Sequence, residues 1–255
     1  MRLTDNTIFI TGGGSGIGRG LAEALHKFGN KVIISGRRKD HLDAVIAVNR
    51  GMEAVELDVV EPQSIAEVAH KVTAEHPALN VLINNAGIML TDNAAGAMDE
   101  RTMTRQIETN LFGPIRVTAA LIEHLKAQRA SWIIYNSSAL AFTPLAPFAV
   151  YSATKAALHS YAMSQRFMLR HTSVRVQEIA PPWVGTGLVG DAADPRVMPL
   201  DKFLADTISA LGTDAEEVLV EEAKIYRNNV GPNEHAYVNQ LNSYMVAALP
   251  GNTHA

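Results

Sequence analysis

Short runs of apolar and β-branched residues recur along the chain, separated by longer segments with helically spaced apolar residues. The runs that we predict to be strands cover residues 7–10, 31–35, 55–58, 81–84, 132–136 and 174–179. Nearly continuous apolar strands that alternate with helices are typical of a parallel sheet covered on both faces. Right-handed crossovers then predict a doubly wound α/β fold, with its ligand outside the carboxyl ends of the strands.

The whole chain, residues 1–255, is predicted to form a single domain. It has 255 residues, of which 47% are hydrophobic, and this is enough to bury one large core. The sequence contains no internal repeat, linker or low-complexity tract that would divide it.

Composition narrows the possible partners. The formal net charge is -4 and the basic residues are scattered, which argues against a nucleic-acid partner. The absence of cysteine excludes disulfides and thiolate chemistry, and the nine histidines show no paired spacing for a metal site. The first residues lack the plan of a signal peptide, and no apolar stretch reaches the roughly 20 residues that cross a bilayer. We therefore expect a cytoplasmic enzyme with no metal and no membrane partner.

A glycine cluster follows the first predicted strand and opens the first predicted helix. Glycines allow a tight turn and a close approach to a pyrophosphate, while the helix N-terminus offers free N–H groups. The alternative is a glycine-rich turn without a ligand, and a P-loop is excluded because Gly18-Arg19-Gly20 lacks the required Lys-Ser/Thr ending. The pattern favours a dinucleotide site with the candidates Gly12, Ser15, Gly16, Ile17 and Gly18.

The end of the second predicted strand indicates which cofactor is bound. Enzymes that use NAD usually have an acid there for the ribose 2′-hydroxyl, but here Arg37 and Arg38 follow Ser35-Gly36. Guanidinium groups suit a 2′-phosphate, so we predict a preference for NADP(H), with NAD(H) still possible. The alternative is that both arginines belong to solvated surface.

Two further segments are candidates for cofactor contacts. Asp58, predicted to end the third strand before Val59, is placed to accept a hydrogen bond from the adenine amino group. Small residues in Asn84-Asn85-Ala86-Gly87 would let the backbone pass close to the cofactor, so Asn85, Ala86 and Gly87 are candidates. A purely structural role for the two asparagines is the alternative.

Tyr151 and Lys155 lie at i and i+4 of a predicted helix and therefore share one face. A phenol has an ordinary pKa of about 10, and a nearby ammonium together with an oxidised nicotinamide would lower that pKa toward neutrality. Lys155 could also bind the nicotinamide ribose. Ser138, just after the strand 132–136, could hold the substrate oxygen beside the phenol, with Ser137 as the alternative.

Asn110 lies in a helical pattern from about Arg101 to Gln128, four residues before Pro114. Since proline has no N–H, the carbonyl of Asn110 loses its usual partner and is free to bind water. We predict that this water links Lys155 to solvent and relays the proton exchanged by Tyr151. The alternative is an ordinary proline kink.

Taken in order, these motifs resemble the short-chain dehydrogenase/reductase family in its single-domain form. The resemblance rests on the glycine motif from Thr11, Asn84-Asn85-Ala86-Gly87, Asn110, Ser138, Tyr151-x-x-x-Lys155 and Pro181 to Thr186. It implies a Rossmann-like fold and an NAD(P)-dependent enzyme acting on CH–OH and C=O groups. It also implies a catalytic tetrad of Asn110, Ser138, Tyr151 and Lys155, and cofactor contacts from Pro181, Val184 and Thr186, the last two at the nicotinamide carboxamide.

Two departures from the family pattern point to one of its branches. Pro181-Pro182 stands where the family usually has Pro-Gly, and Glu217–Val220 leads into an atypical helical tail, residues 221–255. This pattern is similar to the bacterial branch named for the oxidoreductase of the D-alanyl-lipoteichoic acid operon. Since the family's last strand helps to form one tetramer interface, the altered end favours a homodimer through the helices that carry Asn110 and Tyr151.

An apolar lid, residues 187–211, is predicted to cover a hydrophobic ketone, aldehyde or secondary alcohol. These apolar residues could instead be core. His159 and Tyr161 on the helix of Tyr151 are assigned to packing or an interface. Two other functions remain open, a nucleotide-sugar epimerase or dehydratase and a protein that binds NAD(P) without turnover.

Overall fold

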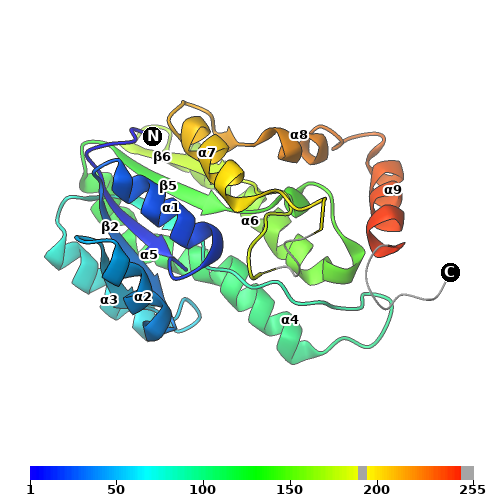
Figure 1. The fold of residues 1–255 in the computed structure, drawn as a ribbon, viewed down its shortest axis with the longest axis horizontal. Coiled ribbons are helices and arrows are strands. Elements are labelled where there is room, and N and C mark those ends of the chain that lie inside the picture. Colours follow the sequence, from blue (N-terminus) through cyan, green and yellow to red (C-terminus); the bar gives the residue numbers. More distant parts are fainter. Residues whose placement is uncertain (189–193, 248–255) are drawn as a thin grey trace.

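The computed structural model describes residues 1–188 and 194–247, which form a seven-stranded sheet in the order β3-β2-β1-β4-β5-β6-β7. Every described strand pair is parallel, and helices cover the sheet on both faces (Figure 1). The strands are β1 Thr7–Thr11, β2 Lys31–Gly36, β3 Glu53–Glu56, β4 Leu79–Asn84, β5 Ser131–Asn136, β6 Val174–Ile179 and β7 Glu217–Val218. This confirms the predicted doubly wound, Rossmann-like α/β fold.

The helices that cover the sheet belong to two separate cores, as the alternation of side chains along the strands requires. Ile8 and Ile10 face one core, with α1 (Gly16–Lys27), α2 (Lys39–Val48) and α7 (Leu200–Leu211). Phe9 faces the other, with α3 (Pro62–Glu75), α5 (Gly113–Ala127) and α6 (Ala149–Leu169). The two layers hold the strands rigidly, so that the loops after them start from fixed positions.

The third strand differs from its prediction, because it ends at Glu56 and not at Asp58. Leu57 N–H still bonds the carbonyl of Gly36 on β2, but the chain then turns, and Asp58 Oδ1 accepts from Val60 N at 3.0 Å. Aspartate side chains favour such turns by bonding the backbone two residues on. Asp58 is therefore a turn residue just beyond the strand.

The predicted helix from Arg101 to Gln128 is divided into three parts. A π-helical turn, η1 (Glu108–Phe112), separates α4 (Glu100–Ile107) from α5. Gly113 N–H bonds the carbonyl of Glu108, five residues back, and Pro114 has no N–H to offer. The irregularity predicted from the proline is a π-bulge that contains Asn110.

Two short 3₁₀ turns, η2 (Ala139–Ala141) and η3 (Ala146–Phe148), lie between β5 and α6.

The tail of the chain follows the short strand β7 and contains the helices α8 (Glu221–Arg227) and α9 (Glu234–Ala247). Figure 1 shows α9 at the opposite end of the molecule from α2 and α3. Of the predicted lid, residues 189–193 lie outside the described part, as do residues 248–255 of the tail.

The second half of the predicted lid is a core helix. Phe203, Ile208 and Leu211 of α7 are buried in the core shared with α1, and Leu204 packs at Gly20 of α1. Of the predicted lid's described residues, only those before α7 therefore line the cleft that could hold a ligand. No helix of the described chain is long and apolar enough to span a membrane, and no three His, Asp or Glu side chains in it gather as a metal site.

Candidate active site

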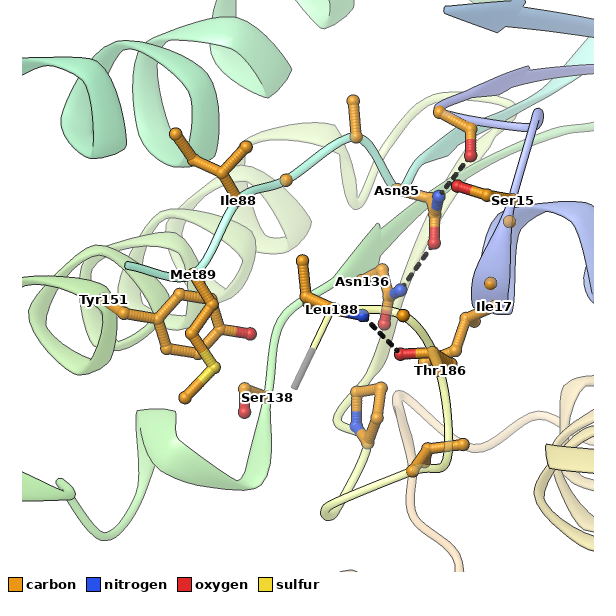
Figure 2. Close-up of a pocket in the computed structure, with 18 of the residues that line it drawn as sticks. Ser15, Ile17, Asn85, Ile88, Met89, Asn136, Ser138, Tyr151, Thr186 and Leu188 are labelled. Carbon is orange, nitrogen blue, oxygen red and sulfur yellow. Dashed lines mark hydrogen bonds between the residues drawn. The ribbon is translucent and has the colours of Figure 1, made fainter. Parts of the chain in front are cut away.

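The loops that follow β1 to β6 meet at the carboxyl edge of the sheet and line one cleft of about 1330 Å³ (Figure 2). The sequence-predicted residues that line it are Gly12, Ser15, Gly16, Ile17, Gly18, Arg37, Arg38, Asp58, Val59, Asn85, Ala86, Gly87, Ser138, Tyr151, Lys155, Pro181, Val184 and Thr186. Asn110 does not line the cleft but lies directly behind it. The structure thus brings together residues that are widely separated in the sequence.

The turn between β1 and α1 is packed too closely for side chains. Gly12 has φ +69, and a Cβ there would lie 2.8 Å from Ala86 Cα. A Cβ on Gly18 would lie 2.3 Å from the carbonyl oxygen of Gly12. Helix α1 begins at Gly16, has no acidic residue in its first turn, and its N-cap Ser15 makes no side-chain capping bond. Free N–H groups and an exposed backbone fit the pyrophosphate of a dinucleotide.

Arg37 and Arg38 follow β2 and line the same cleft beside Asp58 and Val59. Both arginine side chains are exposed, and neither forms a salt bridge within residues 1–188 or 194–247. The next cation, Lys39, pairs instead with Asp43 at 2.7 Å. Two guanidinium groups without a salt bridge in the described part of the chain thus line the cleft just after β2.

Asn85, which follows β4, forms hydrogen bonds with the segments at the ends of β1 and β5. Its Nδ2 donates to the carbonyls of Thr11 at 3.0 Å and Gly12 at 3.2 Å, and its Oδ1 accepts from Asn136 Nδ2 at 2.7 Å (Figure 2). Thr11 Oγ1 in turn accepts from the backbone N–H groups of Asn85 and Ala86. Asn85 therefore has a structural role and also lines the cleft.

Tyr151 and Lys155 lie on one face of α6, with Lys155 Nζ 5.6 Å from the centroid of the Tyr151 ring. Both side chains are buried, and Lys155 Nζ donates to the carbonyl of Asn136 at 2.8 Å. Ser138 lies beside Tyr151 in the cleft (Figure 2). The hydroxyls of Ser138 and Tyr151 thus meet where a substrate oxygen can reach both.

In the protein without the cofactor, burial has the largest effect on the pKa values of Tyr151 and Lys155. Burial raises the pKa of Tyr151 to about 12, and a hydrogen bond with Ser138 opposes the rise. Burial lowers the pKa of Lys155 to about 8, and the nearby carboxylate of Glu178 opposes the fall. The sequence led us to expect that Lys155 and an oxidised nicotinamide together lower the phenol pKa. In the protein without the cofactor the pKa is raised, because the effect of burial outweighs that of the hydrogen bond with Ser138.

Asn110 holds the segment after β4 in place. Its Oδ1 accepts from Ile88 N at 2.9 Å and its Nδ2 donates to Ile88 O at 2.8 Å, so that it pairs with both backbone groups of one residue. A Cβ on Gly87 would lie 3.3 Å from Asn110 Oδ1 and 3.7 Å from Lys155 Nζ. Asn110 and Lys155 therefore both lie close to Gly87.

Comparison with known proteins agrees with this arrangement. Residues 6–196 match the family model described as short chain dehydrogenase. The chain belongs to the short-chain dehydrogenase family. As a member, it is an NAD(P)-dependent oxidoreductase.

A relative shows which branch of the family this dehydrogenase resembles. The uncharacterized oxidoreductase DltE of Bacillus subtilis (strain 168) is 34% identical over 249 residues, which cover 95% of this chain and 99% of that one. This match confirms the resemblance to the branch inferred from the tail.

Two solved structures share the fold over nearly the whole chain. The short chain dehydrogenase from Burkholderia cenocepacia J2315 in complex with NADP is 27% identical, with a TM-score of 0.84 over 94% of this chain and 99% of that chain. The short-chain dehydrogenase from Streptomyces avermitilis is 26% identical, with a TM-score of 0.80 over 96% and 99% of the two chains.

A buried carboxylate behind the site of this dehydrogenase was missed by the sequence analysis. Glu178 on β6 is fully buried, its Oε1 accepts from Ser137 Oγ at 2.5 Å, and its Oε2 pairs with His159 Nδ1 at 2.7 Å. Ser137 thus faces Glu178, and Ser138 faces the cleft. The one available signal was an acid near the end of a strand predicted to be buried on both faces.

Asp92 was also missed, because its partners are distant in sequence. Its Oδ1 accepts from Ala149 N at 3.2 Å and its Oδ2 from Val150 N at 2.8 Å, at the start of α6. The N-cap residue of α6, Phe148, offers no capping side chain. Asp92 therefore caps the helix that carries Tyr151 and Lys155.

Proposed function

We propose that this dehydrogenase prefers NADP(H) and transfers hydride between the nicotinamide and a carbonyl or secondary alcohol, with Tyr151 as general acid and base. The observation that carries the proposal is the meeting of Tyr151, Ser138 and Lys155 in the cleft that also contains the glycine turn. A hydroxyl pair next to a buried cation is suited to proton exchange at a substrate oxygen.

In the direction of reduction, Tyr151 Oη donates its proton to the substrate oxygen, and in the direction of oxidation the phenolate removes it. Ser138 holds the same oxygen through its hydroxyl. Bound NADP(H) supplies or accepts the hydride. Since burial raises the pKa of Tyr151 to about 12 in the protein without the cofactor, formation of the phenolate depends on cations, namely Lys155 and an oxidised nicotinamide.

The proton then leaves by way of Lys155 and a water held by the carbonyl of Asn110. The π-helical turn supports this route, because Pro114 has no N–H to donate to that carbonyl. An experimental structure at high resolution tests the route, and the absence of an ordered water between Asn110 O and Lys155 Nζ would count against it.

The preference for NADP(H) rests on Arg37 and Arg38 and on the lack of a carboxylate directly after β2. A related structure binds NADP, which agrees with it. Pro181, Val184 and Thr186 would hold the nicotinamide end. Values of kcat/KM for NADPH and NADH test the preference, and a higher value for NADH would refute it.

The substrate is expected to be hydrophobic. Beyond Tyr151, the cleft is lined by apolar side chains, among them Leu90, Leu145, Phe148 and Leu188. Residues 187–188 and 194–196 line it as well and form the described part of the lid. Apolar walls with a few convergent polar groups are typical of small-molecule sites.

Tyr151→Phe tests the acid–base assignment directly. Oxidation of NADPH is followed with a panel of ketones and aldehydes, and cofactor affinity is measured by titration. The variant should lose activity by about 10²-fold or more while it still binds NADPH, because only the proton donor is removed. Full activity in the variant would reject the assigned role.

A further inference from the structure

The tail helix α9 lies against the substrate half of the cleft. Leu241 and Met245 of α9 line it, and so does Tyr226 of α8. Leu145 and Phe148, just before the helix of Tyr151, line the same part of the cleft. Building on the proposed function, we propose that α9 is the outer wall of the substrate site and selects uncharged carbonyl compounds or alcohols with an extended apolar tail.

One attachment fixes α9 to the segment that precedes α6. Asn242 Oδ1 accepts from Ala146 N at 2.5 Å, and Asn242 Nδ2 donates to Pro144 O at 3.0 Å. These two backbone groups flank Leu145, which faces the cleft. Asn242 is adjacent to Leu241, so the contact fixes the position of Leu241 relative to Leu145.

A second attachment joins α9 to the lid through Arg196. The guanidinium carbon of Arg196 lies 5.1 Å from the ring centroid of Trp183 and 5.7 Å from that of Tyr244 on α9. Arg196 Nη1 also lies 3.6 Å from Met245 Sδ. Cation–π contacts within about 6 Å are attractive, so Arg196 holds the lid and the tail helix together.

The charges of Arg196 and Asp194, which line the cleft beside α9, balance each other, and this argues for an uncharged ligand. Arg196 forms a two-nitrogen contact with Asp194, at 2.9 Å from Nε to Oδ1 and 2.5 Å from Nη2 to Oδ2. This contact holds the pKa of Asp194 at about 2, so the pair stays ionised near neutrality. A substrate anion would have to displace Asp194 before it could bind Arg196. An apolar tail meets Leu241 and Met245 without that cost.

Binding of unbranched methyl ketones to the NADP⁺-loaded protein tests the wall without turnover, since ketone and oxidised cofactor form a dead-end complex. Calorimetric titration of 2-butanone through longer homologues should show affinity rising by about fourfold per methylene until the cleft is filled. In Leu241→Ala/Met245→Ala the gain in affinity per methylene should disappear for the ketone carbons farthest from the carbonyl and persist for those nearest to it. Gln240→Ala, on the exposed side of α9, is the matched control and should behave as wild type.

Asp194→Asn tests the charge argument as a gain of function. Freed from its carboxylate, Arg196 should bind a ketone with a terminal carboxylate about tenfold more tightly than wild type does, with affinity for the neutral ketone unchanged. Asn242→Ala should weaken binding of long ketones only, and increase hydrogen exchange at the amide of Ala146. Gln240→Ala should leave that amide protected.

Several outcomes would overturn the inference: ketone affinity that is independent of chain length, a double alanine variant that keeps the full gain per methylene, or a wild-type preference for the carboxylate ketone. Failure of the proposed function is recognised separately. In that case ketones still bind with the dependence on Leu241 and Met245, but NADPH is not consumed and Tyr151→Phe changes nothing.

Discussion

At the scale of single residues, Lys155 combines a catalytic position with a cost to stability. Its ammonium is buried and donates to the carbonyl of Asn136, and burial lowers its pKa from 10.5 to about 8. The folded state therefore binds fewer protons than the unfolded state between these two values. Below pH 8 the buried charge destabilises the folded protein by its full amount. This destabilisation decreases as the pH rises toward 10.5.

Lys155→Met is accordingly expected to stabilise the protein while it abolishes activity. The gain should be about 2 kcal/mol at pH 7, since removal of the buried charge is offset in part by the unpaired carbonyl of Asn136. Urea unfolding at pH 7 and pH 10 measures it, with Lys126→Met on the surface as control. The gain should shrink at pH 10, and a variant less stable than wild type at pH 7 would contradict the argument.

Arg37 and Arg38 allow a second prediction at the same scale. Their exposed guanidinium groups line the nucleotide end of the cleft, with no acid beside them in the segment Ser35–Arg38. Arg37→Ala/Arg38→Ala should lower kcat/KM for NADPH by about tenfold or more and change that for NADH little, because only NADPH has the 2′-phosphate. Arg50→Ala, an exposed arginine outside the cleft, is the control. Equal losses with both cofactors would mean that the arginines do not distinguish them.

At the scale of elements, α6 depends on a cap supplied from outside the helix. Asp92 bonds the N–H groups of Ala149 and Val150, so its loss should cost about 1 kcal/mol of stability and loosen the turn that carries Tyr151. We expect Asp92→Ala to lower kcat several-fold, and Asp92→Asn, which keeps one acceptor, to lower it less.

Asp99→Ala is the matched control for that prediction. Asp99 caps α4 through Arg101 N and Thr102 N and does not line the cleft. Asp99→Ala should lower the free energy of unfolding, measured in urea, by a similar amount and leave kcat unchanged. If both variants change kcat alike, Asp92 does not act by positioning α6.

The sequence predicts elements well where the contacts that make them are local. β6 has the predicted bounds, and the glycine turn and the pair Tyr151 and Lys155 lie where their spacing indicated. Pro114 signalled an irregular helix, because the loss of its N–H is a local property. The form of the irregularity, a π-helical turn, depends on packing around Asn110 and could not be read from the proline.

Contacts between distant segments account for most of what the sequence did not reveal. Glu178 meets His159 only because β6 and α6 pack together, and Asp92 reaches Ala149 across 57 positions. The tail was predicted to be helical, but no periodic pattern indicates that Asn242 would attach it beside Leu145. Such pairs are fixed by topology, which a single sequence leaves open.

At the scale of the whole molecule, one side of α6 is unusually apolar for a surface. Met163 and Phe167 lie one turn apart on this helix and are 43% and 61% exposed. Met168, next to them, is exposed at 73%, and Phe112 on the π-helical turn at 41%. Contiguous exposed apolar residues often mark protein–protein interfaces, and Met163 and Phe167 share one face of α6. They favour the proposed homodimer through the helices that carry Asn110 and Tyr151.

A pair of charges on this surface tests the assembly. Met163→Glu/Phe167→Glu should give a monomer in light scattering, because a C₂ interface brings each new carboxylate near its own copy. Ile225→Glu, an equally exposed change on α8, should leave the mass near twice 27.5 kDa. Since α6 also holds Tyr151 and Lys155, the monomer should have lower activity as well. A wild-type monomer or tetramer, or a dimer that survives the two glutamates, would rule out this interface.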